Sequence, residues 1–114
     1  TIVSCALYFQ NTNKENGCLR VIPGSHEIGI LPHDSISHIE GIQWIDETKL
    51  NPNSILDLEL NAPYAVFFNI NMIHGCYPNT SNGTRFSLAW EYIESSNNNV
   101  ASSVDNWCDR NPVG

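Results

Sequence analysis

Positive charge is scarce in this chain. Its 114 residues include five Lys and Arg against twelve Asp and Glu, which gives a formal net charge of −7 at pH 7. Binding to nucleic acids or to anionic membranes rests on clustered cations, so five dispersed positive charges argue against both kinds of partner. Long apolar runs are also missing, because no stretch approaches the roughly 20 residues that a membrane-spanning helix needs. The sequence therefore predicts no nucleic-acid partner and no membrane span.

The cysteines lack any recognisable pattern. Cys5, Cys18, Cys76 and Cys108 contain no CxxC pair and no spacing typical of zinc ligands. This density does not mark a disulfide scaffold, so we expect free thiols, with two disulfides as the alternative.

Thr1 opens directly in an apolar run, with no Met and no basic signal region before it. No secretion signal is visible, and we expect an intracellular protein whose compartment the sequence does not specify.

The chain does contain enough apolar residues, 41%, for one small packed domain. Alternating or continuous apolar runs predict strands at 2–9, 18–22, 55–60, 64–68 and 85–93, with a further short one around 42–45. No window keeps a helical period, so we predict an all-β sandwich, jelly roll or cupin-like barrel. We expect residues 1–93 to form its core, residues 27–53 a loop-like rim, and the Ser- and Asn-rich stretch 94–114 an irregular tail.

A polar segment separates the first two predicted strands. Asn11–Gly17 (NTNKENG) ends in Asn-Gly, the dipeptide most typical of tight β-hairpins. We therefore expect residues 2–9 and 18–22 to pair as an antiparallel hairpin.

The last predicted strand has two contrasting faces, since alternate side chains of a strand share a face. Its bulky face consists of Phe86, Leu88, Trp90 and Tyr92. Its opposite face is small and polar, and consists of Arg85, Ser87, Ala89 and Glu91. Small residues with one cation suit the lining of a cavity in a barrel, while the alternative is a face that meets water.

A histidine and an arginine flank the polar turn before that strand. His74 follows the apolar run Tyr64–Phe68, and Arg85 lies eleven residues further on. If both flanking segments are neighbouring antiparallel strands, the two side chains start about 5 Å apart at Cβ. A neutral imidazole is a ligand for Fe(II), and a guanidinium binds a carboxylate through two parallel hydrogen bonds. The pair could hold the two ends of one small ligand, although either residue alone is more typical of a structural histidine or a solvated arginine.

Two blocks of the chain resemble one enzyme family. Glu15–His26 (ENGCLRVIPGSH) is similar to the NG-x-L-x-x-x-PGSH signature of the phytanoyl-CoA dioxygenase (PhyH) family, and Ile30–Asp34 continues it. A second block resembles the family at Val66–Phe68, Ile73–Gly75, Asn79 and Arg85. The resemblance covers about residues 1–93, with both motifs in the family's order.

This resemblance implies an Fe(II)/2-oxoglutarate-dependent dioxygenase on a double-stranded β-helix. Such an enzyme uses O₂ to hydroxylate a small organic or lipid-like substrate, and it converts 2-oxoglutarate to succinate and CO₂. The family holds iron with two histidines and one carboxylate. His74 matches the distal histidine, and Arg85 matches the arginine that binds the far carboxylate of 2-oxoglutarate, with Ser87 beside it. His26 belongs to the signature without being a ligand, so it either braces its loop or lies near the site.

The family's His-x-Asp motif, which supplies the other two ligands, is absent from this sequence. It would lie shortly before Thr1, so we expect the chain to begin downstream of it and to bind iron poorly and be inactive by itself. His38-Ile39-Glu40 offers a His-x-Glu alternative, but its polar setting favours an exposed loop. Two other functions stay open: a halogenase, which would have a small residue in place of the carboxylate ligand, and a non-catalytic binding protein on the same scaffold.

Overall fold

The computed structural model describes residues 2–32, 34–35 and 43–94. The predicted tail from residue 95 on, Cys108 and the His38–Glu40 alternative lie outside these residues. The longer strands are β1 (Ile2–Tyr8), β6 (Tyr64–Asn69) and β8 (Ser87–Ile93). The shorter ones are β2 (Leu19–Val21), β3 (Asp34–Ser35), β4 (Gln43–Trp44), β5 (Leu56–Asp57) and β7 (His74–Cys76). Three 3₁₀ turns join them, η1 (Ser25–Glu27), η2 (Glu47–Lys49) and η3 (Pro52–Ser54), so the all-β prediction is confirmed.

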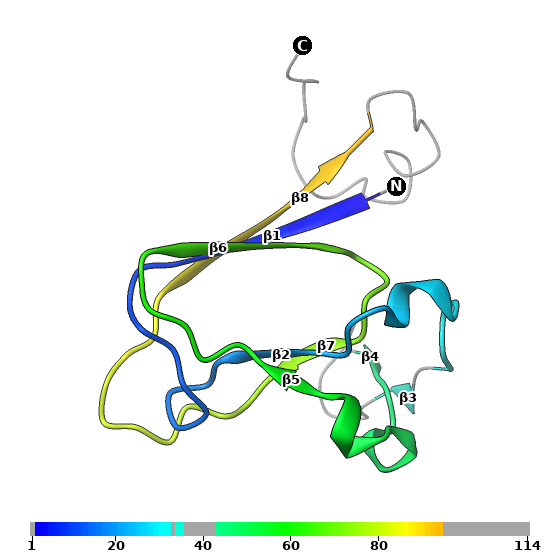
Figure 1. Cartoon of the computed structure of the whole chain (residues 1–114), viewed down its shortest axis with the longest axis horizontal. Helices are drawn as coiled ribbons and strands as arrows, with labels where there is room; N and C mark the ends of the chain where they lie inside the picture. Colours follow the sequence, from blue (N-terminus) through cyan, green and yellow to red (C-terminus); the bar gives the residue numbers. More distant parts are fainter. Residues whose placement is uncertain (1, 33, 36–42, 95–114) are drawn as a thin grey trace.

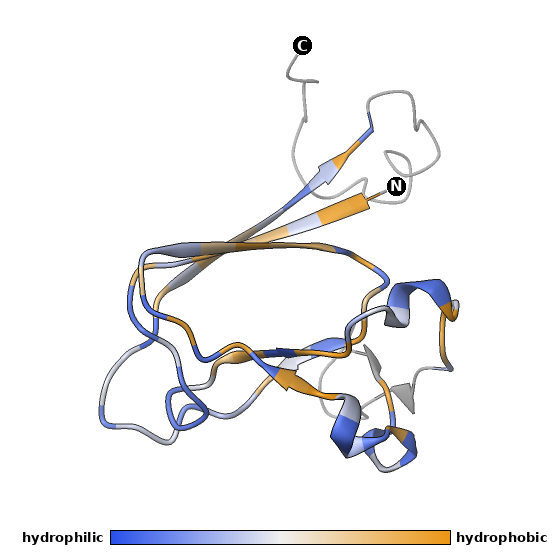
Figure 2. Ribbon diagram, viewed as in Figure 1, coloured by the Kyte–Doolittle hydropathy of each residue, from blue (hydrophilic) through white to orange (hydrophobic). Residues whose placement is uncertain are grey.

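Two antiparallel sheets face each other (Figure 1). The first sheet has the strand order β6-β1-β8 and the second has the order β5-β2-β7, while β3 and β4 form a separate pair. In Figure 2 the apolar colour is clearest on β1, β2 and β5, whereas most of β8 is pale or polar. Among the described residues, no helix has the length and apolar character needed to cross a bilayer.

The predicted hairpin between residues 2–9 and 18–22 is wrong. β1 lies between β6 and β8 in the first sheet, whereas β2 lies between β5 and β7 in the second. The intervening segment forms a local turn instead, in which the Cys18 amide donates to the Asn13 carbonyl at 2.8 Å. The side chains of Asn13 and Asn16 each accept from the other residue's amide, which tightens this turn. This turn therefore lies in the connection that crosses from β1 in the first sheet to β2 in the second.

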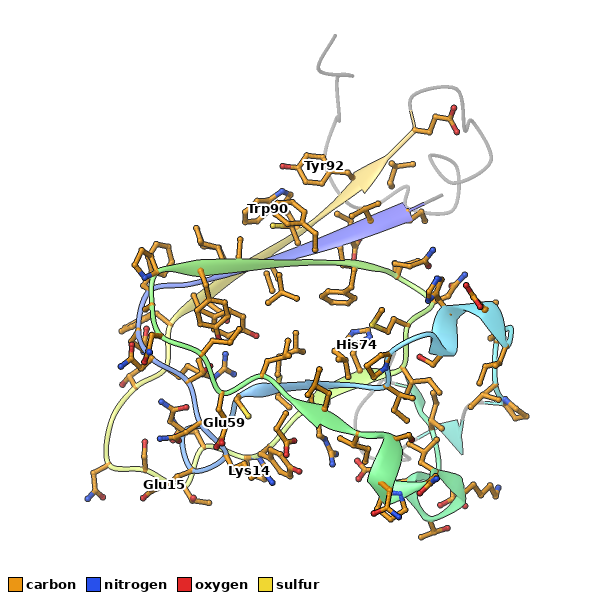
Figure 3. All side chains as sticks on the ribbon, in the orientation of Figure 1. Lys14, Glu15, Glu59, His74, Trp90 and Tyr92 are labelled. Atoms are coloured by element: carbon orange, nitrogen blue, oxygen red, sulfur yellow. The ribbon has the colours of Figure 1, made fainter. Side chains whose placement is uncertain are left out.

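The strand register decides which side chains point between the sheets. Directly opposite residues share a face, and Tyr8 is opposite both Tyr64 and Ser87. The buried cluster of Ala6, Tyr8, Leu19, Val21 and Phe68 marks this face as the inner one. Ser87, Ala89 and Glu91 therefore share the face of Tyr8, but all three are exposed and none lines the cavity beside His74, so this face fits the alternative of a surface that meets water. The bulky side chains of β8 point outward and are exposed, and Figure 3 shows Trp90 and Tyr92 on that outer side.

Among the described cysteines, Cys5, Cys18 and Cys76 are all free, which agrees with the expected thiols. Cys5 and Cys18 are completely buried, so both behave as small core residues rather than as accessible nucleophiles.

Candidate active site

His74 begins β7 and points into the space between the two sheets (Figure 3). It lies opposite Val21, a core residue, and its ring centroid is 4.9 Å from that of Phe68 on the first sheet. The Nδ1 atom is 2.7 Å from the Met72 carbonyl oxygen. A carbonyl only accepts, so Nδ1 carries the proton and donates it there. The lone pair of Nε2 is then free for a metal ion, the arrangement usual for metal-binding histidines.

Arg85 lies just before β8, and its side chain extends along the inner face of the first sheet. The guanidinium carbon is 5.6 Å from the centroid of the Tyr8 ring, and Nη1 donates to Ser87 Oγ at 3.2 Å. Nε is buried and has no hydrogen-bond partner in the part of the chain that the structure describes. A buried donor without an acceptor costs about 1–3 kcal/mol, so the position of Nε is unfavourable in the structure as it stands.

The two residues do not come from neighbouring strands, and that prediction is wrong. β7 belongs to the second sheet and β8 to the first, because the connection between them crosses from one sheet to the other. Both side chains nevertheless contact the same inner wall, His74 at Phe68 and Arg85 at Tyr8. Phe68 is opposite Ser4, four positions from Tyr8, so the two contacts lie on the order of 13 Å apart along β1. The two side chains therefore approach the same wall from different sheets and at separate points.

The wall around Arg85 is aromatic and uncharged. The rings of Tyr8 and Tyr64 stack with centroids 4.9 Å apart, and the Tyr64 hydroxyl is hydrogen-bonded to Thr12 Oγ1. Burial raises the pKa of Tyr8 to about 12, although the Arg85 guanidinium opposes this shift. Burial also raises the pKa of Tyr64. Both phenols are therefore neutral at physiological pH, and no carboxylate of the described residues forms an ion pair with Arg85.

A cavity of about 610 Å³ adjoins His74. Its lining is largely aliphatic and includes Ile22, Ile30, Leu31, Ile55, Met72 and Ile73. Ile30, Leu31 and Ile45 come from the segment 27–53 and lie at its wall, as expected for a rim. Arg85 is not part of this lining, so the cavity extends from His74 away from Arg85.

His26, which the sequence predicted either to brace its loop or to lie near the site, is part of η1. Its Nδ1 is buried without a partner among the described residues, and its Nε2 is 4.0 Å from Glu27 Oε1. His26 is absent from the cavity lining. The neighbouring residue, Ser25, instead contacts the backbone beside His74: its Oγ accepts from the Ile73 amide at 2.8 Å. Sequence reasoning missed Ser25, because a serine in a turn motif carries no sign of a partner 48 residues away.

His74 stands apart as a metal-ligand candidate. Within residues 2–32, 34–35 and 43–94, no group of three His, Cys, Asp or Glu side chains could hold a metal ion. One histidine with a free Nε2 fits a site that takes further ligands from elsewhere, and it does not make a complete site by itself.

The model of the phytanoyl-CoA dioxygenase (PhyH) family matches residues 1–87. This chain belongs to that family. It is 31% identical over 104 residues to the phytanoyl-CoA dioxygenase domain-containing protein 1 homolog of Dictyostelium discoideum, covering 87% of this chain and 37% of that protein. It is 29% identical over 101 residues to the peroxisomal phytanoyl-CoA dioxygenase of Bos taurus, covering 82% and 29% of the two chains. The Homo sapiens protein of the same name is 27% identical over 99 residues, with coverage of 80% and 28%.

The predicted family resemblance is therefore confirmed, and the chain is related to dioxygenases. It spans only 28% to 37% of the length of these relatives.

Proposed function

We propose that this chain forms part of an Fe(II)/2-oxoglutarate-dependent dioxygenase that hydroxylates a small organic or lipid-like substrate. The carrying observation is that His74, with its free Nε2, and Arg85, with no carboxylate partner among the described residues, both contact the inner face of the first sheet. Family membership supplies the reaction class. The two facing antiparallel sheets also support the proposal that residues 1–93 belong to a double-stranded β-helix.

In this proposal each residue has one task. His74 holds the iron through Nε2, while the other two ligands come from outside the described residues. The bound iron, together with 2-oxoglutarate, supplies the oxidation of the substrate by O₂, with release of succinate and CO₂. Arg85 binds the far carboxylate of 2-oxoglutarate, and the hydroxyl hydrogen of Ser87 is available as a second donor because Ser87 Oγ only accepts from Arg85.

The surrounding residues preorganise this binding. The Tyr8 ring holds the guanidinium by a cation–π contact and keeps water from one side of it. Since no described carboxylate neutralises Arg85, its charge is available to a dianionic cosubstrate. The aliphatic cavity beside His74 would take an apolar part of the substrate, so that a C–H bond lies near the metal.

The test compares succinate formation by the full-length protein and its Arg85→Ala variant at increasing 2-oxoglutarate. Loss of hydrogen bonds to a charged group, about 1.5–3 kcal/mol, predicts a decrease of about 10- to 100-fold in kcat/KM for 2-oxoglutarate. Lys49→Ala, which removes a cation from the exposed turn η2, is the matched control and should leave this value unchanged. An unchanged kcat/KM in Arg85→Ala would show that the assigned role is wrong.

The same assay separates the alternatives. A chlorinated product formed in the presence of chloride would assign the halogenase reaction. Absence of any 2-oxoglutarate turnover, with an intact iron site, would favour the non-catalytic binding protein.

A further inference from the structure

The turn Pro23–His26 packs against the backbone just before His74. We infer that Ser25 is a positioning residue that fixes the orientation and tautomer of the His74 imidazole. The role assigned to His74 rests on the proposed function, whereas the contact between the two residues is independent of it.

The hydrogen bonds between β2 and β7 change at this point. The register places Val21 opposite His74, and one step further the Ile22 amide donates to the Ile73 carbonyl at 3.0 Å. A regular antiparallel pair would return a bond from the Ile73 amide to the Ile22 carbonyl. Instead, the Ile73 amide donates to Ser25 Oγ at 2.8 Å, and the Ile22 carbonyl accepts from the Ser25 amide at 3.2 Å. Ser25 is thus inserted into the ladder beside His74.

One peptide group links Ser25 to the imidazole. The Ile73 amide and the Met72 carbonyl belong to the same planar unit, so the orientation of one fixes the orientation of the other. Ser25 Oγ holds this unit at its N–H, while His74 Nδ1 donates to its C=O at 2.7 Å. The hydroxyl therefore sets the direction of the carbonyl that selects the Nδ1–H tautomer and exposes the Nε2 lone pair.

Burial makes this link hard to replace. Ser25 is 3% exposed, so its hydroxyl is shielded from bulk water where it accepts from the Ile73 amide. Gly24, with φ +78°, adopts the left-handed conformation that turns the chain to bring Ser25 back onto β7. In Ser25→Ala the Ile73 amide would lose its acceptor. Rotation of the peptide toward the Ile22 carbonyl would then turn the Met72 carbonyl away from Nδ1.

The test measures the His74 tautomer by ¹⁵N NMR of the imidazole, at one pH where the ring is neutral and without metal. The wild-type protein and Ser25→Thr, which keeps the hydroxyl, should show the Nδ1–H form alone. Ser25→Ala should show both tautomers, and Ser25→Cys, a weaker acceptor of nearly the same size, should give an intermediate mixture. Ser54→Ala removes an exposed serine that donates to the Asn51 carbonyl, and it should match the wild type.

A second readout is metal affinity. Partners that orient a metal-binding histidine are typically worth about 10- to 100-fold in affinity, so the Fe(II) affinity of the full-length protein should decrease by this factor in Ser25→Ala and recover in Ser25→Thr. A pure Nδ1–H signal in Ser25→Ala or Ser25→Cys would overturn the inference. Because the NMR measurement needs neither iron nor 2-oxoglutarate, failure of the proposed function would leave its result unaffected.

Discussion

The two sheets are stabilised in different ways. The first consists of strands of six or seven residues, and its inner face carries the buried aromatic side chains of Tyr8 and Phe68. The second consists of strands of two or three residues, and side chains complete its backbone hydrogen bonding. Thr12 Oγ1 donates to the Leu58 carbonyl at 2.9 Å, and Ser25 Oγ accepts from Ile73. Long strands with a buried inner face thus stabilise the first sheet, whereas individual side-chain hydrogen bonds complete the second.

Their outer faces differ as well. The first sheet exposes Phe67, Leu88, Trp90 and Tyr92 on its outer face. The second sheet carries charge there, with an ion pair between Lys14 Nζ and Asp57 Oδ2 at 2.7 Å and another between Arg20 and Glu47. Arg20 also lies over the Tyr77 ring, 4.8 Å from its centroid. The site takes one residue from each sheet, so its geometry depends on both kinds of stabilisation.

The largest expected effect tests the inner face of the first sheet. Phe68→Ala removes a buried ring that contacts His74, and it should lower the free energy of unfolding by about 3–5 kcal/mol. Phe67→Ala, the neighbouring position, removes a ring that is 62% exposed and should cost less than about 1 kcal/mol. Urea unfolding of both variants measures the difference. Equal losses would contradict the assignment of the inner and outer faces.

A smaller loss of unfolding free energy is expected at the two glycines on either side of β2, Gly17 and Gly24. A Cβ at Gly17 would lie 2.7 Å from the Tyr77 carbonyl oxygen, and its φ of +83° is already unfavourable for other residues. Gly17→Ala should therefore cost about 3 kcal/mol. Gly24 has a similar φ of +78° with nothing within 4 Å, so Gly24→Ala should cost about 1 kcal/mol. If thermal unfolding shows the same loss for both, the close approach at Gly17 is absent.

The smallest effect concerns the charged outer face of the second sheet. The hydrogen bond from Lys14 holds the pKa of Asp57 below its ordinary value. Asp57 therefore stabilises the folded state above the ordinary aspartate pKa of about 4, and this contribution is lost as the pH falls through the lower folded pKa. Asp57→Asn and Lys14→Met should each flatten the acid limb of the unfolding midpoint plotted against pH. An acid limb identical to that of the wild type would count against the pair.

Local patterns predicted part of this molecule. Alternation along 85–93 placed Ser87, Ala89 and Glu91 on one face, and the register puts this face on the side of Tyr8, although the three residues are exposed and do not line the cavity. His74 and Arg85 were found from residue type and from the family motif. The partners of β1 and β2 were not predictable, because Asn-Gly favours a turn without specifying which strands meet beyond it. Ser25 was missed for a related reason, since its role depends on a peptide 48 residues away.

The most direct test of the central claim is a crystal structure of the full-length protein with Fe(II) and 2-oxoglutarate under anaerobic conditions. The account predicts that His74 Nε2 coordinates the metal and that the far carboxylate of 2-oxoglutarate accepts hydrogen bonds from Arg85. A cosubstrate carboxylate bound away from Arg85, or a metal without His74 as ligand, would contradict it.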